Sequence, residues 1–175
     1  MIITLTGFMG CGKSSTGREL AARLGARLVD LDGEIVARTG RSIPDIFREG
    51  GETAFRAVEL EMLRAVLDEA DAAAGDIILA LGGGALTLPE ARQEVFSRTR
   101  CVWLRTRLET IRERIGAADA SRPLFADADA LYAAREPIYS QAPYAVDTDG
   151  KTPAGVAGEI VQKLAFNRRY PIVSN

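Results

Sequence analysis

The sequence predicts an α/β fold, with a parallel β-sheet covered by helices. Short runs rich in β-branched residues alternate with helical segments along the 175 residues, a pattern typical of parallel sheets. Near the start, Gly7-Phe8-Met9-Gly10-Cys11-Gly12-Lys13-Ser14 fits the pattern G-x-x-x-x-G-K-[ST] at every fixed position. A strand-like run precedes this stretch and a helical run follows it, which is the context that a phosphate-binding loop requires.

Each element of this fold has its own signal. The sequence favours strands at residues 2–6, 27–30, 77–81, 101–105 and 144–146. The first helix, 13–24, ends at Gly25. Ser42 is expected to cap a short helix through Arg48, and residues 53–70 form a longer helix with apolar residues at helical spacing.

The remaining helix starts are read from caps. Thr87 and Thr106 are each followed three residues later by a glutamate, which predicts two capping boxes, and Thr152 before Pro153 caps the last helix. Residues 116–130 are too polar for a core and are expected to form a mobile lid. Residues 167–175 show no periodicity and are expected to be a loosely held tail, which leaves one domain over residues 1–166.

Composition excludes several classes of function. With 22 basic and 24 acidic residues the net charge is −2 and the pI is about 5.3, so no broad basic surface is available for nucleic acid. No apolar run approaches the roughly 18 residues of a membrane span, and the first strand leaves no room for a signal peptide. Cys11 and Cys101 fall in a loop and a strand and are not expected to pair, which favours the cytoplasm.

The glycine-rich loop predicts a site for a nucleoside triphosphate. Its amide groups and the positive end of the following helix dipole favour an anion. Lys13 is expected to reach the β- and γ-phosphates and the Ser14 hydroxyl to ligate Mg²⁺. Cys11 lies at a helix N-terminus, where its pKa could be lowered, or it is simply a small loop residue.

Other unusual residues follow the later strands, whose carboxyl ends form the ligand-binding edge of a parallel sheet. Asp30 and Asp32 are two apart, so on an extended chain they point the same way. One could hold water on Mg²⁺ while the other accepts a proton from a hydroxyl; alternatively, Asp32 caps a helix that starts near Gly33. The chain has no histidine, so a proton acceptor must be a carboxylate or water.

Glycines and arginines complete the candidate set. Gly82-Gly83-Gly84 follows an apolar strand and indicates close approach to the backbone, although a loose turn would also fit. Arginine suits carboxylates and phosphates, and the candidates are Arg56, Arg122 and Arg135. Each of these arginines could instead be a solvated surface charge, and Arg56 could form an ordinary pair with Glu59.

Taken together, these residues resemble the shikimate kinase family. The matching pieces cover nearly the whole chain except the tail: Gly7–Ser15, Val29-Asp30-Leu31-Asp32-Gly33-Glu34-Ile35, Arg38-Thr39-Gly40-Arg41-Ser42-Ile43, the stretch from Ile46-Phe47 to Gly51-Glu52, Phe55-Arg56, Glu59, the triple glycine, Arg122-Pro123-Leu124 and Arg135-Glu136-Pro137-Ile138-Tyr139. Many families share the phosphate loop. The order of Asp-x-Asp, Phe-Arg and triple glycine is much more specific.

The resemblance implies a P-loop NTPase of the nucleoside-monophosphate-kinase-like type, with five parallel strands in the order 2-3-1-4-5. It implies transfer of the ATP γ-phosphoryl group to the 3-hydroxyl of shikimate, with Mg²⁺, by a monomer. On the nucleotide side it implies phosphate binding by the loop residues Gly10, Cys11, Gly12, Lys13, Ser14 and Ser15. Asp30 would stand behind the waters of Mg²⁺, and Arg114 would stack on adenine opposite residues 147–153.

On the acceptor side, the resemblance implies that Asp32 holds the shikimate hydroxyls and acts as base. Arg56 and Arg135 would clamp the carboxylate of shikimate, and Glu59 would brace Arg56. The backbone of the glycine loop, Gly82, Gly83 and Gly84, would lie against the ring. Arg122 would enter with the lid, although the stretch from Arg122 to Arg135 is several residues shorter than the family pattern.

Three other functions remain open from the sequence. A second small-molecule kinase of this fold, such as a gluconate kinase, would share the phosphate loop but not the Asp-x-Asp, Phe-Arg and triple-glycine set. A regulatory ATP-binding module would keep Lys13 and Ser14 but could lose Asp32 or Arg122, and both are present. A GTPase is disfavoured, because asparagine occurs only at positions 167 and 175 and the guanine-binding motif is absent.

Overall fold

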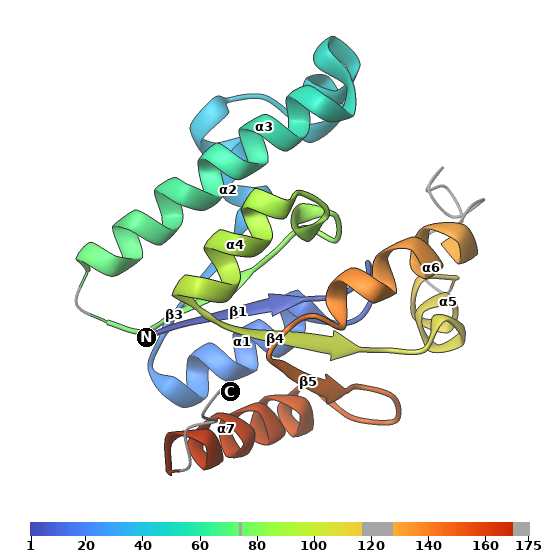
Figure 1. The fold of residues 1–175 in the computed structure, drawn as a ribbon. Helices are drawn as coiled ribbons and strands as arrows, with labels where there is room; N and C mark the ends of the chain where they lie inside the picture. The colour runs from blue at the N-terminus through green and yellow to red at the C-terminus, as the bar shows by residue number, and fades with distance from the viewer. Residues whose placement is uncertain (74, 117–127, 170–175) are drawn as a thin grey trace.

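A parallel sheet runs through the middle of the chain (Figure 1). The structure is a computed structural model, and it describes residues 1–73, 75–116 and 128–169. Within these ranges the sheet has the order β2-β3-β1-β4-β5 with all neighbours parallel, as the sequence predicts. Its strands are β1 (Ile2–Thr6), β2 (Arg27–Asp30), β3 (Ile77–Ala80), β4 (Arg100–Arg105) and β5 (Tyr144–Asp147).

Helices cover both faces of the sheet. They are α1 (Lys13–Leu24), α2 (Leu31–Thr39), α3 (Ile43–Ala72), α4 (Pro89–Arg98), α5 (Leu108–Gly116), α6 (Ala128–Tyr139) and α7 (Pro153–Arg169), with a 3-10 turn η1 (Ala85–Thr87). In Figure 1, α1 and α7 lie on one side of the sheet and α3 and α4 on the other, while α5 and α6 stand at the end to which the strands point. The loops at that end are therefore framed by helices.

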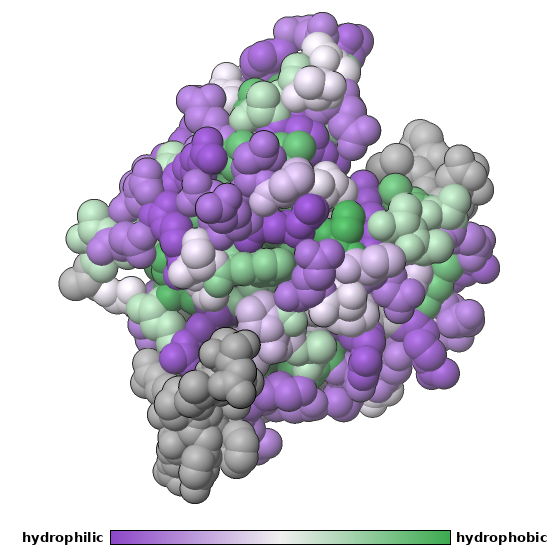
Figure 2. Space-filling model, in the orientation of Figure 1, coloured by the Kyte–Doolittle hydropathy of each residue, from purple (hydrophilic) through white to green (hydrophobic). Residues whose placement is uncertain are grey.

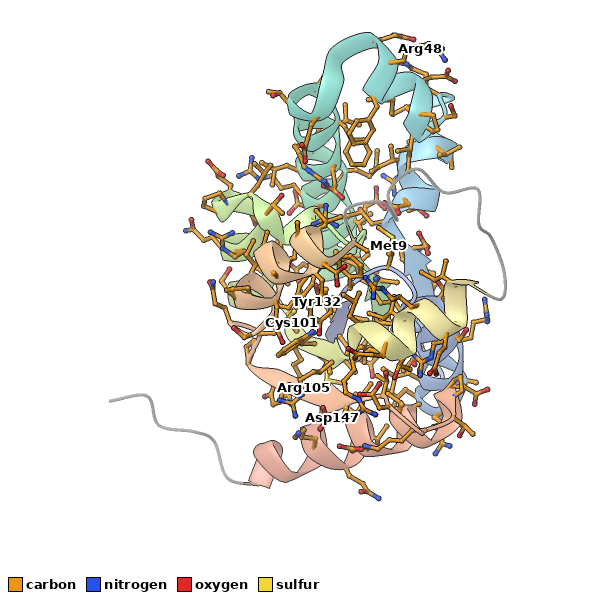
Figure 3. The ribbon with its side chains drawn as sticks, turned by 90° about the vertical axis from the view of Figure 1, so that its right-hand side faces the viewer. Met9, Arg48, Cys101, Arg105, Tyr132 and Asp147 are labelled. Carbon is orange, nitrogen blue, oxygen red and sulfur yellow. The ribbon has the colours of Figure 1, made fainter. Side chains whose placement is uncertain are left out.

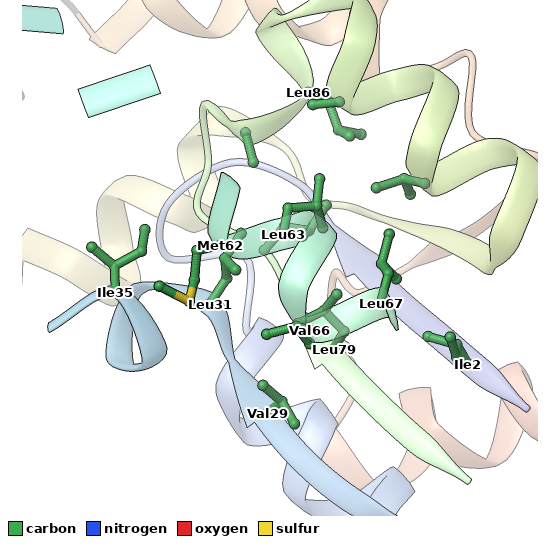
Figure 4. Packing of buried hydrophobic residues seen from close by; sticks show 14 of the residues in the cluster. Ile2, Val29, Leu31, Ile35, Met62, Leu63, Val66, Leu67, Leu79 and Leu86 are labelled. Carbon is green, nitrogen blue, oxygen red and sulfur yellow. The ribbon is translucent and has the colours of Figure 1, made fainter. Parts of the chain in front are cut away.

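The alternation of side chains along the strands creates two cores. In β1, Ile3 and Leu5 pack with α1 and α7, whereas Ile2 packs with α3 and α4. Figure 4 shows the core on the side of α3 and α4, where Leu63 and Leu67 of α3 lie over the strands. A third, aromatic cluster forms beneath the loops at the carboxyl ends and contains Phe8, Trp103, Ile111, Ile115 and Tyr139.

Two predicted helix caps are confirmed. The amide of Asp45 donates to Ser42 Oγ at 3.2 Å at the start of α3. The amide of Gly155 donates to Thr152 Oγ1 at 3.1 Å at the start of α7. At Gly51 the backbone leaves the helical region (φ 69°, ψ −168°), so α3 consists of the short and the long helix that the sequence predicts.

The two predicted capping boxes are wrong. The Thr87 hydroxyl donates to the carbonyl of Gly84 at 2.7 Å, and α4 starts at Pro89 without a side-chain cap. The Thr106 hydroxyl shares a hydrogen bond of 2.6 Å with that of Thr148, and the Asp149 carboxylate accepts the amide of Arg107 instead. In both places a partner distant in the sequence, or a tight turn, outcompetes the local pattern.

The boundaries of the two irregular segments differ from expectation. Helix α6 begins at Ala128, inside the predicted lid, and α7 continues to Arg169, inside the predicted tail. The central lid residues 117–127, including Arg122, and the end of the tail, 170–175, lie outside the described residues.

The face of the molecule seen in Figure 2 is mostly polar. Figure 2 shows a hydrophilic face with only small hydrophobic areas. Among the residues with described side chains, the large apolar ones that stand exposed are Val36 (42%) and Phe47 (37%). None of the described helices combines the length and the apolar character needed to cross a bilayer.

Candidate active site

The loop between β1 and α1 is built to receive an anion. Gly10 has a φ of 75°, and a Cβ there would lie 2.7 Å from Cδ1 of Ile115, so both backbone conformation and space require glycine. Gly12 precedes α1 without a side-chain cap, and the first turn of this fully described helix has no acidic residue. The amide groups at the start of α1 therefore remain available for a phosphate.

Lys13 lies underneath this loop. Its ammonium group donates to the carbonyl of Gly7 at 2.7 Å and to that of Phe8 at 3.0 Å. Figure 3 looks onto this edge of the sheet, with Met9 of the loop near its centre. Two carbonyls of the phosphate loop therefore hold the ammonium group of Lys13, and its charge lies beside the site where phosphates are expected.

A cavity of about 470 Å³ opens beside the loop. Its walls include Gly10, Cys11, Gly12, Lys13, Ser14, Ser15, Arg114, Thr148, Lys151 and Pro153. The guanidinium of Arg114 donates to the carbonyl of Cys11 at 3.3 Å and to that of Thr148 at 3.1 Å, which ties the phosphate loop to the loop after β5. The predicted nucleotide residues from Gly10 to Ser15 and Arg114 therefore meet in one cavity.

Asp30 and Asp32 point to different places, and the expectation that they share one direction is wrong. Strand β2 ends at Asp30, which caps α2 by accepting the amide of Gly33 at 3.2 Å, while Asp32 lies in the first turn of that helix. The alternative that Asp32 caps the helix is therefore wrong as well. The other oxygen of Asp30 accepts the Ser14 hydroxyl at 3.5 Å.

The glycine loop after β3, Gly82 to Gly84, lies next to the charged residues that the sequence proposes for the acceptor. A Cβ on Gly82 would lie 2.8 Å from Oδ1 of Asp32 and 2.9 Å from Oε1 of Glu59. A Cβ on Gly84 would overlap the guanidinium of Arg56. These glycines have no positive φ, so the need for space, rather than for a special backbone conformation, selects them.

Gly83 lies between Arg135 and the phosphate loop. The position of its missing Cβ is 3.5 Å from Nη1 of Arg135, on α6, and 3.6 Å from the amide of Met9 in the phosphate loop. The glycine loop therefore adjoins the phosphate loop, and Asp32 lies close enough to Lys13 to feel its charge. The interpretation of the triple glycine as a loose turn is wrong.

Arg56 and Glu59 form a buried ion pair. Arg56 is 9% and Glu59 3% exposed, and Nη1 of the arginine donates to Oε2 of Glu59 at 2.5 Å. Glu52 accepts from the same guanidinium at 3.3 Å, and the Phe55 ring lies 5.1 Å from it. Arg56 is not a solvated surface charge, because its orientation is fixed on several sides.

The carboxyl groups of this half have perturbed pKa values. Burial raises the pKa of Asp32 above its ordinary value of 3.8, and the charge of Asp30 raises it further, while Lys13 and Arg56 lower it. Burial also raises the pKa of Glu59, against the lowering effect of Arg56. Oε1 of Glu59 is buried without a hydrogen-bond partner among the described residues. A carboxylate with a raised pKa is suited to accept a proton.

The sequence analysis assigns no role in the site to two groups at this edge, and it expects Thr106 only as a helix cap. The hydroxyl of Tyr139 donates to the carbonyl of Gly83, and the buried hydroxyl pair of Thr106 and Thr148 joins the loops after β4 and β5. Spacing offered one signal, since Tyr139 follows Arg135 by one helical turn. No local sequence pattern predicts the pairing of Thr106 with Thr148, because the two residues are 42 positions apart in the chain.

Comparison with known proteins gives a consistent result. The family model described as shikimate kinase matches residues 9–165. The chain is 44% identical over 168 residues to a shikimate kinase of Thermus thermophilus, covering 93% of this chain and 89% of that protein. It is 37% identical over 166 residues to one from Persephonella marina, covering 93% and 98%. A solved shikimate kinase from Acinetobacter baumannii, in complex with shikimate, superposes with a TM-score of 0.85 at 33% identity, covering 95% of this chain and 94% of the other.

Proposed function

The chain belongs to the shikimate kinase family, and from this premise we propose how its residues divide the work of the reaction. The protein is an ATP-dependent kinase that transfers the γ-phosphoryl group of ATP to the 3-hydroxyl of shikimate. The observation that carries the proposal is that two loops lie side by side. Gly83, which faces Arg135, also adjoins the amide of Met9 in the phosphate loop, so donor and acceptor would meet in one crevice.

On the nucleotide side, the loop amides and Lys13 bind the triphosphate. Lys13 exchanges the carbonyls of Gly7 and Phe8 for phosphate oxygens and stabilises the charge that develops during transfer. Adenine lies in the cavity between Arg114 and Pro153. Arg114 suits this role, since two backbone carbonyls hold its guanidinium in place.

The residues near the start of α1 fit Mg²⁺. The Ser14 hydroxyl and the Asp30 carboxylate are oxygen donors, the type that Mg²⁺ prefers, and they lie 3.5 Å apart beside the phosphate loop. Ser14 would ligate the ion directly and Asp30 through water. When bound, the ion neutralises phosphate charge.

On the acceptor side, Asp32 binds the shikimate hydroxyls and Arg56 and Arg135 bind the carboxylate. The 3-hydroxyl oxygen forms a bond to the γ-phosphorus while the bond to the β,γ-bridging oxygen breaks and its electron pair leaves with ADP. Asp32 accepts the hydroxyl proton, a role that its raised pKa supports. The glycine loop permits the ring to approach the backbone, because side chains at Gly82 and Gly84 would fill the space.

Arg122 completes the proposal from outside the described residues. The lid sequence Arg122-Pro123-Leu124 would close over the crevice, exclude water and bring a third arginine to the transferring group. We also propose a cytoplasmic monomer. Cys11 and Cys101 are buried free thiols, as is usual in reducing compartments.

A coupled ADP-release assay tests the function. With Mg-ATP, we expect turnover that depends on shikimate, with a product that carries one phosphate at the 3-hydroxyl. Reactions without acceptor and with gluconate are the controls. Equal rates with and without shikimate, or faster turnover with gluconate, would contradict the proposal.

A further inference from the structure

One buried hydroxyl connects the glycine loop to the helix that carries Arg135. Tyr139 is the last residue of α6 and is 2% exposed. Its hydroxyl donates to the carbonyl of Gly83. The link therefore joins two parts of the acceptor site that are 56 residues apart in the sequence.

The surroundings of Tyr139 fix this hydroxyl. Its ring lies against that of Trp103, with 6.4 Å between the ring centroids, and belongs to the aromatic cluster that also contains Phe8. Burial raises the pKa of the phenol, so the group stays protonated and remains a donor. Because the ring cannot move freely, its hydroxyl holds the carbonyl of Gly83 at a set distance from α6.

Two side chains of the same helix lie at Gly83. The hydroxyl of Tyr139 binds its carbonyl, and Nη1 of Arg135, one helical turn earlier, lies 3.5 Å from the position of its missing Cβ. The two side chains thus flank one residue of the loop against which the acceptor is proposed to lie. A shift of the loop relative to α6 would change the distance between the acceptor ring and Arg135.

We propose that Tyr139 is a positioning residue for the acceptor, whose hydroxyl keeps the glycine loop and Arg135 in the spacing that binds the acceptor carboxylate. The inference rests on the proposed function, since the acceptor is taken to be shikimate. Tyr139 does not touch the reacting atoms; it acts through Gly83 and through the helix that carries Arg135.

The Tyr139→Phe variant tests this role, because it removes the hydroxyl and keeps the ring packed against Trp103. Tyr132→Phe is the matched control. Tyr132 lies on the same helix (Figure 3), belongs to the same aromatic environment, and also donates its hydroxyl to a backbone carbonyl, that of Thr106 at 3.0 Å. Both variants lose the same kind of hydrogen bond, but only one lies at the glycine loop.

For Tyr139→Phe we expect the KM for shikimate to rise by about five- to thirty-fold, the size expected for one lost buried hydrogen bond. The KM for ATP should change by less than about twofold, within the scatter of such effects. Tyr132→Phe should leave the KM for shikimate unchanged. A merely structural role would lower the Tm or the active fraction of Tyr139→Phe and leave both KM values unaltered, which would overturn the proposal.

Hydrogen exchange supplies a readout that does not depend on turnover. Without any substrate, the amides of residues 82–88 should exchange faster in Tyr139→Phe than in wild type or Tyr132→Phe, and equal rates would overturn the proposal. Wild-type protein is assayed with shikimate first. Absence of shikimate-dependent turnover there would overturn the proposed function, whereas normal wild-type turnover with an unchanged KM in Tyr139→Phe would overturn only the role of Tyr139.

Discussion

The phosphate loop and the glycine loop follow neighbouring strands, β1 and β3, and both are rich in glycine for different reasons. The phosphate loop uses positive φ values, as at Gly10, to turn its amides inward. The glycine loop has ordinary φ values and lacks side chains because Asp32, Glu59 and Arg56 occupy the space. The first loop is therefore shaped by its own backbone and the second by charged groups that other elements bring to it.

The largest effects should come from removing one chemical group on each side. Lys13→Ala should lower kcat by about 10²–10³-fold, because a charge that stabilises the transferring phosphoryl group is lost. Asp32→Asn should lower kcat by about 10²–10⁴-fold with little change in nucleotide affinity, because the proton acceptor is lost. Steady-state kinetics and ATP titration measure both. Near-normal turnover of Asp32→Asn would remove it as the base, and near-normal turnover of Lys13→Ala would remove its phosphate role.

The two arginines of the acceptor side provide a second comparison. Arg56→Ala and Arg135→Ala should each weaken shikimate binding by about 2–5 kcal/mol, measured by calorimetry. Only Arg56→Ala should also destabilise the fold, by about 3–5 kcal/mol at neutral pH, because it leaves Glu59 buried without its partner. Arg135 is partly exposed, and denaturant titration should show little loss for its variant. Unchanged shikimate affinity in both variants would refute the carboxylate clamp.

The stability lost in Arg56→Ala should depend on pH. Glu59 has a pKa raised above its ordinary value of 4.5 by burial, and removal of Arg56 takes away a lowering influence. A carboxyl whose pKa is raised in the folded state lowers the stability of the protein as pH rises from its unfolded pKa toward its folded pKa, because ionisation is easier in the unfolded chain. Well below pH 4.5 the group is neutral in both states, and near pH 4.5 it is only partly ionised in the unfolded chain. The difference in Tm between variant and wild type should therefore be smaller near pH 4.5 than at pH 8.

Adding Glu59→Gln to Arg56→Ala serves as the control for that prediction. The double variant has no carboxylate at position 59, so its Tm relative to wild type should vary less with pH than that of Arg56→Ala. A gap in Tm that stays constant from pH 4.5 to pH 8 in the single variant would show that the ion pair does not govern its stability.

These two loops also differ in how far the sequence could predict them. The phosphate loop is contiguous, and one motif predicts its residues Gly12, Lys13 and Ser14, with the strand and helix around it correct to the residue. Strand order followed from resemblance rather than from any local pattern. The hydrophobic alternation that placed the strands is a local property, and it survives in the folded sheet.

The residues proposed for the acceptor side lie around the glycine loop, but the sequence does not predict their geometry. The sequence predicts Asp32 on an extended chain. In the structure α2 begins directly after Asp30, and the carboxylate of Asp32 lies next to Gly82. Thr87 and Thr106 were read as caps, yet each finds another partner. Such contacts join segments far apart in the chain, and single-sequence patterns carry no information on them.

Two glycine substitutions test the contrast between the loops directly. Gly10→Ala should disturb nucleotide binding alone, because its φ of 75° would strain an alanine by about 1–2 kcal/mol and its Cβ would meet Ile115. Gly84→Ala should disturb shikimate binding but not nucleotide binding, because its methyl group displaces the guanidinium of Arg56. Inserting this methyl group should lower the free energy of unfolding by about 1–3 kcal/mol. The measurements are both KM values and the Tm. A Gly84→Ala enzyme with normal shikimate KM would show that Arg56 is free to move.

The smallest effect is expected at Gly83. A Cβ there would make only ordinary contacts, with 3.5 Å to Arg135 and 3.6 Å to Met9, so Gly83→Ala should leave stability within about 0.5 kcal/mol of wild type. Its methyl group would nevertheless project between the phosphate loop and Arg135, into the space assigned to the acceptor. We expect a rise of about tenfold in the KM for shikimate, the effect of one methyl group in a binding site. Since the fold tolerates this methyl group, an unchanged KM would place the acceptor elsewhere, whereas a rise without loss of stability separates the need for an open loop from the need to fold.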